Sequence, residues 1–234
     1  MQRILDFPLN EVMNFGNFVE CDGNAASLRF ARRIADPDDS EHLLYIHGPS
    51  GSGKTHLLRS VEHEISVGSP SIYLSCREMP TTDILMRHFG NAEALILDDI
   101  HLLPDDRGVK SALWQLFNDF SGKGMRVVMA GTFPPRELSS LDDHLVSRLL
   151  WGLVSRVDVT DDNSRRMILQ KAAYDRQVRV PDDVLDYLLK TGSREAGYLV
   201  RCIELLYRLS LETKRKITLS LLKEALELKL TGAD

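Results

Sequence analysis

A glycine-rich loop is the part of this sequence best suited to bind a ligand. Residues 48–55 read GPSGSGKT, the G-x-x-x-x-G-K-T spacing of a phosphate-binding loop. Glycines let successive backbone N–H groups point at a phosphate, the lysine can reach the β and γ phosphates, and the threonine hydroxyl suits Mg²⁺. The sequence therefore predicts a nucleoside di- or triphosphate site at Gly48, Pro49, Ser50, Gly51, Ser52, Gly53, Lys54, Thr55 and His56.

Two adjacent carboxylates follow an apolar run, ALIL, at residues 94–97. A carboxylate at the end of a strand beside a phosphate-binding loop holds Mg²⁺ through its water shell. Asp98, with Thr55, is therefore the predicted Mg²⁺ site. Asp99 is then placed to orient or deprotonate the water that attacks the γ phosphate. The alternative is a polar turn that ends a buried strand.

One arginine lies on a segment whose apolar residues are spaced to pack inward. Leu141, Leu145 and Leu149 would face the core, so that Arg148 points away from it. An arginine held in this way can deliver positive charge to a γ phosphate bound by a neighbouring subunit. The alternative is a surface arginine that only aids solubility.

Short apolar runs alternate with helical patterns through the first two thirds of the chain. The loop needs a strand before it and a helix after it, and residues 43–47 and 56–65 have these patterns. Short, wholly apolar strands separated by helices indicate a parallel sheet covered on both faces. The further predicted strands are 71–75, 94–97, 127–130 and 153–159, with helices at 83–89 and 109–120.

The strand pattern stops at about residue 160, and only helical patterns follow. Pro181 and the two aspartates after it are typical of a helix start. We expect a nucleotide-binding α/β base over residues 11–159 and a helical unit over 160–234. The predicted helices of that unit are 164–174, 182–190, 194–213 and 219–228.

Composition limits the partners and the cellular compartment that we expect for the protein. The formal net charge of −5 provides no whole-chain positive field for a polyanion. The three cysteines, Cys21, Cys76 and Cys202, are scattered and lack metal-ligand spacing, which favours a reducing compartment. No signal peptide or membrane-spanning run is apparent, so we expect a cytoplasmic protein with no membrane partner.

Taken together, these residues resemble the AAA+ ATPases and, within them, the DnaA-related proteins. The similar stretches are FGNFV at 15–19, LDDI at 97–100, FN at 117–118 and DHLVSRLLWG at 143–152. The resemblance runs from about residue 13 to the end. It implies a five-stranded parallel base with a small all-helical lid, ADP or ATP as cofactor with its adenine near Phe18 and Val19, and Arg148 as an arginine finger.

Two differences from DnaA make the chain more similar to the Hda proteins, which promote hydrolysis of DnaA-bound ATP. DnaA ends in a helix-turn-helix domain that reads duplex DNA, whereas this sequence stops after the lid. The stretch between Ser75 and Leu95 is too short for the helices that DnaA inserts there to engage single-stranded DNA. The resemblance implies DnaA as a partner, negative regulation of replication initiation and no direct reading of duplex DNA.

The first residues are similar to the sliding-clamp-binding peptide of the Hda proteins. They read QRILDF from Gln2, and a glutamine followed by spaced apolar anchors suits a groove with a polar rim. Gln2, Leu5 and Phe7 are therefore the expected contacts with the DNA polymerase sliding clamp, from a tail over residues 1–10. The alternative is a segment that packs on the base.

Three positions depart from the family pattern. The phosphate-binding loop is intact, although Hda loops are often eroded and associated with ADP, which leaves ATP hydrolysis by this chain open. The lid arginine that reaches the nucleotide in DnaA corresponds to Gly197, and Arg194 or Arg201 could replace it. Thr132 stands near the acidic first sensor of DnaA.

The sequence therefore leads to one hypothesis and two rivals. The hypothesis is an Hda-like regulator that works with the sliding clamp and places Arg148 at an interface with DnaA. The first rival is a self-assembling ATPase, in which Lys54, Asp98, Asp99 and Arg148 serve a homo-oligomer. The second is a helicase loader or adaptor that recruits a partner without stimulating hydrolysis.

Overall fold

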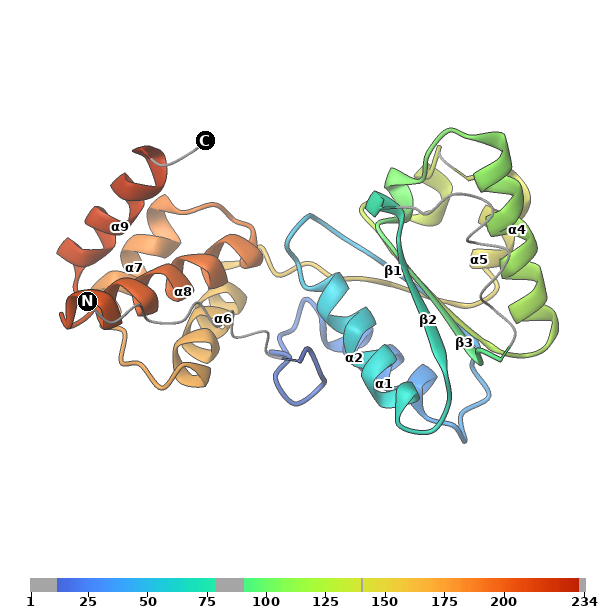
Figure 1. The fold of residues 1–234 in the computed structure, drawn as a ribbon, viewed down its shortest axis with the longest axis horizontal. Coiled ribbons are helices and arrows are strands. Elements are labelled where there is room, and N and C mark those ends of the chain that lie inside the picture. Colours follow the sequence, from blue (N-terminus) through green and yellow to red (C-terminus); the bar gives the residue numbers. More distant parts are fainter. Residues whose placement is uncertain (1–11, 79–90, 140, 232–234) are drawn as a thin grey trace.

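A parallel sheet with helices on both faces forms one part of the computed structural model, which describes residues 12–78, 91–139 and 141–231 (Figure 1). The strand order is β2-β3-β4-β1-β5, and every pairing is parallel. All strands therefore end at the same edge of the sheet. The strands are β1 Leu43–His47, β2 Ser71–Ser75, β3 Ala94–Asp98, β4 Arg126–Gly131 and β5 Leu153–Arg156.

Helices α1 (Ala25–Ala35) and α2 (Lys54–Ser66) cover one face of the sheet. Alternate residues of a strand point to opposite faces, so Ile46 and Ile96 pack against these two helices. Helix α1 buries Leu28, Ala31 and Ile34 from an otherwise arginine-rich segment. No helix was predicted for these residues.

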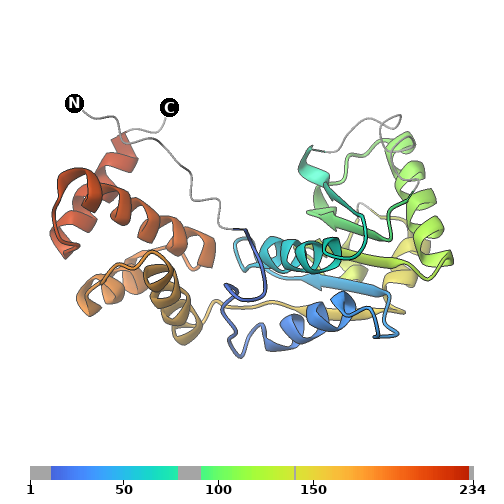
Figure 2. The same ribbon diagram turned by 60° about the horizontal axis from the view of Figure 1, so that its bottom comes forward.

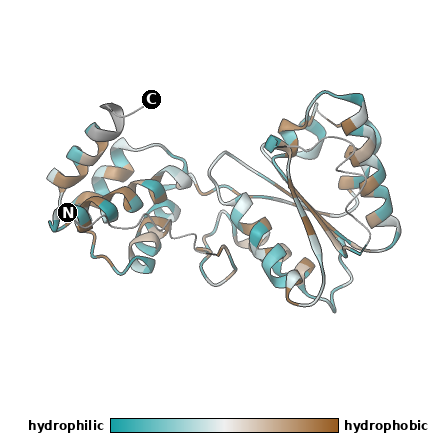
Figure 3. Ribbon diagram, in the orientation of Figure 1, coloured by the Kyte–Doolittle hydropathy of each residue, from teal (hydrophilic) through white to brown (hydrophobic). Residues whose placement is uncertain are grey.

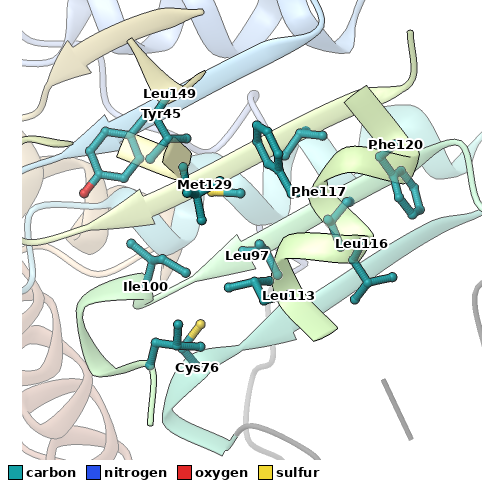
Figure 4. Packing of buried hydrophobic residues seen from close by; sticks show 14 of the residues in the cluster. Tyr45, Cys76, Leu97, Ile100, Leu113, Leu116, Phe117, Phe120, Met129 and Leu149 are labelled. Atoms are coloured by element: carbon teal, nitrogen blue, oxygen red, sulfur yellow. The ribbon is translucent and has the colours of Figure 1, made fainter. Parts of the chain in front are cut away.

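Helices α4 (Arg107–Gly122) and α5 (Asp143–Leu149) cover the opposite face. Figure 4 shows Phe117 and Leu113 of α4 packed over the strand residues Leu97 and Met129. Because each central strand is buried on both faces, its sequence is apolar without interruption. The hydropathy colouring shows these strands running between helices with mixed surfaces (Figure 3).

Four helices form a separate bundle beside the sheet (Figure 1, Figure 2). A hydrophobic cluster of their own holds them together, with Leu188, Leu199 and Leu206 fully buried. Arg165 is only 1% exposed, and its guanidinium donates to the carbonyls of Leu189 and Ser193. The helices are α6 Asp162–Asp175, α7 Asp182–Thr191, α8 Ala196–Thr213 and α9 Leu219–Thr231.

The predicted fold class, a five-stranded parallel α/β base followed by a helical lid, is confirmed. Strand β5 ends at Arg156 and not at the predicted residue 159. Beyond it, the Val157 N–H still bonds to the His47 carbonyl, but the Asp158 N–H bonds to the carbonyl of Gly23. The chain thus leaves the sheet to pair with the segment before α1.

The other predicted bounds differ by a few residues or cannot be compared. Helix α8 begins at Ala196 and not at Arg194, and the predicted helix at 83–89 lies outside the described residues. Helix α5, which holds Arg148, had no helix prediction. None of the helices in the described segments is long and apolar enough to cross a membrane.

Gly152 should be essential for the packing of β5 on β1. A methyl group at Gly152 would lie 2.5 Å from the Leu43 carbonyl oxygen, which is shorter than two non-bonded atoms can approach without a shift of the backbone. We expect Gly152→Ala to lower the free energy of unfolding by about 1–3 kcal/mol in urea denaturation. Gly122→Ala is the control, because nothing lies within 4 Å of the added methyl group. Equal stability of the two variants would contradict this account.

Candidate functional site

The phosphate-binding loop joins the end of β1 to the first turn of α2. Gly51 and Gly53 have φ values of 68° and 102°, a region that residues with a side chain rarely adopt. These conformations turn the loop around the N-terminus of α2, whose free N–H groups favour an anion. The Ser52 hydroxyl is buried and has no hydrogen-bond partner among the described residues. The loop therefore offers the donors that a phosphate requires.

The Lys54 side chain is enclosed by the loop. It is 7% exposed, and its ammonium donates to the carbonyls of Gly48 and Pro49 at 2.9 and 2.8 Å. Burial lowers the pKa of Lys54, while the charges of Asp98 and Asp99 oppose this shift. Gly48 and Pro49 thus contribute to the site through their carbonyls, which hold the Lys54 ammonium. Residues 50–56 line the neighbouring cavity.

The predicted Mg²⁺-side residues meet in the structure. The Thr55 hydroxyl donates to Asp98 Oδ2 at 2.6 Å, and the Asp99 N–H donates to Asp98 Oδ1 at 2.8 Å. Asp98 is 3% exposed, which is tolerable for a carboxylate only with such partners. The Thr55 oxygen keeps a lone pair that can ligate a cation.

The donor set fits a magnesium ion that is carried by phosphates. Among the described residues, no group of three or more His, Cys, Asp or Glu side chains is arranged to hold a metal alone. Mg²⁺ typically takes one or two protein ligands together with phosphate oxygens and waters. When bound, such an ion neutralises charge on the phosphates. Thr55 would hold it directly, and Asp98 through water.

Asp99 lies at the edge of the same cavity in a strained backbone conformation. Its φ is 54°, and its carboxylate forms an ion pair with Arg77 at 3.2 Å. Nearby, His101 Nε2 and the Thr132 hydroxyl lie 3.0 Å apart, and both residues line the cavity. No motif in the sequence indicated Arg77 or His101 as site residues. Only the register of β2 beside β3, which pairs Ser75 with Asp98, brings Arg77 to Asp99.

A cavity of about 580 Å³ lies between the loop, the segment before α1 and the lid. This volume lies within the range of small-molecule sites. Phe18 and Val19, the residues expected near the adenine, line it, and the Phe18 ring meets His56 edge-on at 5.2 Å. The apolar lid residues Ile168 and Val200 also line it. Apolar walls next to a phosphate-binding loop suit a planar base.

His56 ties the segment before α1 to helix α2. Its Nε2 lies 3.1 Å from the Asn14 carbonyl and 2.9 Å from Asn17 Oδ1. A methyl group on Gly53 would lie 3.2 Å from the Phe18 ring. His56 therefore helps to position Phe18 at the cavity in addition to lining it.

The lid contacts the loop directly. The backbone N–H of Gly197, in the first turn of α8, donates to the Gly51 carbonyl at 3.0 Å. A Cβ atom on Gly197 would lie 3.4 Å from Arg201 Nη1. The Arg201 guanidinium thus occupies the space beside Gly197 and lines the cavity, whereas Arg194 donates to the Thr160 carbonyl and does not line it.

Arg148 is not part of this cavity. Its guanidinium donates to Asn118 Oδ1 at 2.6 Å and lies 5.1 Å from the centre of the Trp114 ring. Arg148 is half-buried at the end of α5, and it is not among the residues that line the cavity in the described part of the chain. The prediction that it points away from the core describes its position only in part, because α4 holds its side chain. The predicted clamp-binding residues Gln2, Leu5 and Phe7 lie outside the described residues.

Arg201 should contribute to phosphate binding more than Arg194. We expect Arg201→Ala to weaken ADP binding about tenfold, because one hydrogen bond to a charged group is lost. Arg194→Ala should leave the affinity unchanged, since its guanidinium is bonded elsewhere. Titration with a fluorescent ADP analogue measures both. A weaker affinity only in the Arg194 variant would reverse this assignment.

Comparison with known proteins supports one family. A family profile described as the bacterial DnaA ATPase domain matches residues 9–156, and one described as the Hda lid domain matches residues 162–226. The chromosomal replication initiator DnaA of Lactococcus lactis subsp. cremoris is 31% identical over 77% of this chain and 43% of the relative. That of Leifsonia xyli is 32% identical over 84% and 45%. The chain spans less than half the length of these relatives.

Solved structures of DnaA have the same fold as this chain. Domain III of the Thermotoga maritima replication initiation protein DnaA has a TM-score of 0.82 at 25% identity, covering 94% of this chain and 98% of that domain. AMPPCP-bound DnaA from Aquifex aeolicus has a TM-score of 0.74 at 23% identity, covering 89% and 70%, which supports the fold alone. With a DnaA-type ATPase domain followed by an Hda-type lid, the chain belongs to the DnaA-related AAA+ ATPases as an Hda-like member.

Proposed function

We propose that this protein is an Hda-like negative regulator of bacterial replication initiation. It binds adenine nucleotide in the cavity and, together with the sliding clamp, promotes hydrolysis of the ATP bound to DnaA. The family membership and the Hda-type lid support the assignment. DnaA and the clamp are its proposed partners, and the buried free cysteines suit a reducing cytoplasm.

The position of Arg148 carries this proposal. Its guanidinium is held by Asn118 and lies outside the chain's own cavity. A cation outside the chain's own cavity suits a role on a nucleotide that a neighbouring molecule binds. An arginine that reaches a γ phosphate from a neighbour stabilises the charge that develops during hydrolysis. We therefore assign Arg148 as the finger that acts on ATP held by DnaA.

The chain's own nucleotide, ADP or ATP with Mg²⁺, has a mainly structural or regulatory role in this proposal. Lys54 would contact its phosphates, and Phe18 and Val19 would contact the adenine. The AMPPCP-bound DnaA structure supports an adenine nucleotide in a cavity of this fold. Because the Gly51 carbonyl is bonded to Gly197, a nucleotide on the loop would also stabilise the lid.

Clamp binding by Gln2, Leu5 and Phe7 rests on the sequence alone. A glutamine with two apolar anchors matches a peptide that docks in an apolar groove. The clamp encircles DNA, so it would concentrate the regulator near DnaA on the chromosome. Attachment to a common partner raises the effective concentration without any new contact.

A self-assembling ATPase is the second candidate. The direct contact of Thr55 with Asp98 and the enclosed Lys54 support a phosphate and Mg²⁺ site that would serve the chain's own catalysis. Asp99 would then orient the attacking water, and Arg148 would act on the next copy in a homo-oligomer. ATP turnover that rises with protein concentration and needs neither DnaA nor clamp would favour this role. Stable association with a helicase would favour a loader or adaptor.

Replacement of Arg148 should abolish the stimulation of ATP hydrolysis on DnaA. With DnaA-bound ATP and clamp loaded on DNA, we expect Arg148→Ala to lower stimulated hydrolysis about 10³-fold or more, within the range measured for such fingers. Arg215→Ala, an exposed arginine of the lid paired with Glu224, is the control. Thermal unfolding checks that both variants fold. Full stimulation by the Arg148 variant would contradict the proposal.

The clamp requirement is tested by removing residues 1–9. We expect the shortened chain to bind ADP normally but to lose the part of the stimulation that depends on clamp. Phosphate release from DnaA-bound ATP, with and without loaded clamp, separates the two effects. Equal stimulation by the intact and shortened chains would exclude the tail as the clamp-binding element.

A further inference from the structure

A tyrosine from the edge strand β2 contacts the carboxylate at the centre of the site. The Tyr73 hydroxyl donates to Asp98 Oδ2 at 2.7 Å. The same oxygen accepts from Thr55 at 2.6 Å, and Oδ1 accepts from the Asp99 N–H at 2.8 Å. A carboxylate has about four lone-pair positions. Donors from the described residues fill three of them, which leaves one position on Oδ1 for a water.

The register of the sheet explains why Tyr73 meets Asp98. Tyr73 pairs with Ile96, and Asp98 lies two residues beyond Ile96 on the same face of β3. Both Tyr73 and Ile96 belong to the hydrophobic cluster under α1 and α2. The hydroxyl therefore reaches Asp98 on the face of the sheet that helix α2 covers.

Helix α2 holds the tyrosine in place. The Arg59 guanidinium lies 3.3 Å from the centre of the Tyr73 ring, and its other contact is an ion pair with Glu62. Arg59 is one helical turn after Thr55, so the same face of α2 reaches Asp98 directly through Thr55 and indirectly through Tyr73. Thr55 touches the carboxylate itself, whereas Arg59 covers the ring whose hydroxyl touches it.

We propose that Tyr73 is a positioning residue that orients the Asp98 carboxylate toward Thr55 and thereby sets the affinity of the site for Mg²⁺ with its nucleotide. The inference rests on the proposed nucleotide binding. Partners that orient a metal-side carboxylate usually contribute 10- to 100-fold to metal affinity.

The test is the Mg²⁺ dependence of ADP binding by the full chain carrying Tyr73→Phe. A fluorescent ADP analogue is titrated in EDTA and at increasing Mg²⁺. We expect the variant to bind ADP like the wild type in EDTA, but to need about tenfold more Mg²⁺ for the same gain in affinity. Thr55→Ala sets the size of the effect when the direct ligand is lost.

Tyr45→Phe is the matched control. The Tyr45 hydroxyl also donates a hydrogen bond, to the Phe133 carbonyl at 2.6 Å, but it lies on the other face of the sheet. We expect it to leave the Mg²⁺ dependence unchanged. If Tyr73→Phe does not fold, Arg59→Ala replaces it, because it frees the ring without removing the hydroxyl. A shift to higher Mg²⁺ in that variant supports the proposal, and no shift overturns it.

The outcomes separate this inference from the proposed function. A wild-type chain that binds no ADP would refute the proposed nucleotide site itself. Wild-type binding that needs Mg²⁺, with the same dependence in Tyr73→Phe, would overturn only the role of Tyr73. Wild-type binding without any Mg²⁺ dependence would also overturn the role of Tyr73 and leave the nucleotide site standing.

Discussion

The hydrogen bond between Thr55 and Asp98 connects the first turn of α2 to the end of β3, and the geometry of the site depends on it. Asp98 is almost completely buried, and a buried carboxylate is tolerated only when its oxygens accept hydrogen bonds. Thr55, Tyr73 and the Asp99 backbone supply them. The parallel sheet makes this meeting possible, because the loop after β1 and the end of β3 lie at one edge.

The second connection in the site runs from the loop to the lid. The Gly51 carbonyl accepts a backbone hydrogen bond from Gly197, at the start of α8. Both positions are glycines at close approach, and a methyl group on Gly51 would lie 3.1 Å from Cβ of Glu195. The loop and the lid are therefore joined through backbone atoms. Arg148, held by α4, lies outside this connection.

Elements with strong local patterns could be predicted, and those with weak patterns could not. The central strands are uninterrupted apolar runs, so their positions agreed within a residue. Helix α1 was missed because its buried face has only two large apolar residues, Leu28 and Ile34, and otherwise consists of alanine and serine. Helix α5 has only seven residues, fewer than two full turns of periodicity. Strand β5 ended early because tertiary contacts with Gly23 replaced its ladder.

The sequence by itself determined the phosphate-binding loop, because glycine spacing, Lys54 and Thr55 are contiguous and their chemistry is local. It also determined Asp98 as the partner of Thr55 and the class of fold. Only the tertiary structure decided that Tyr73 shares Asp98, and that Arg201 rather than Arg194 reaches the cavity. These contacts depend on strand order, register and the approach of α8 to the loop, which join residues far apart in the chain. No local pattern specifies such distances.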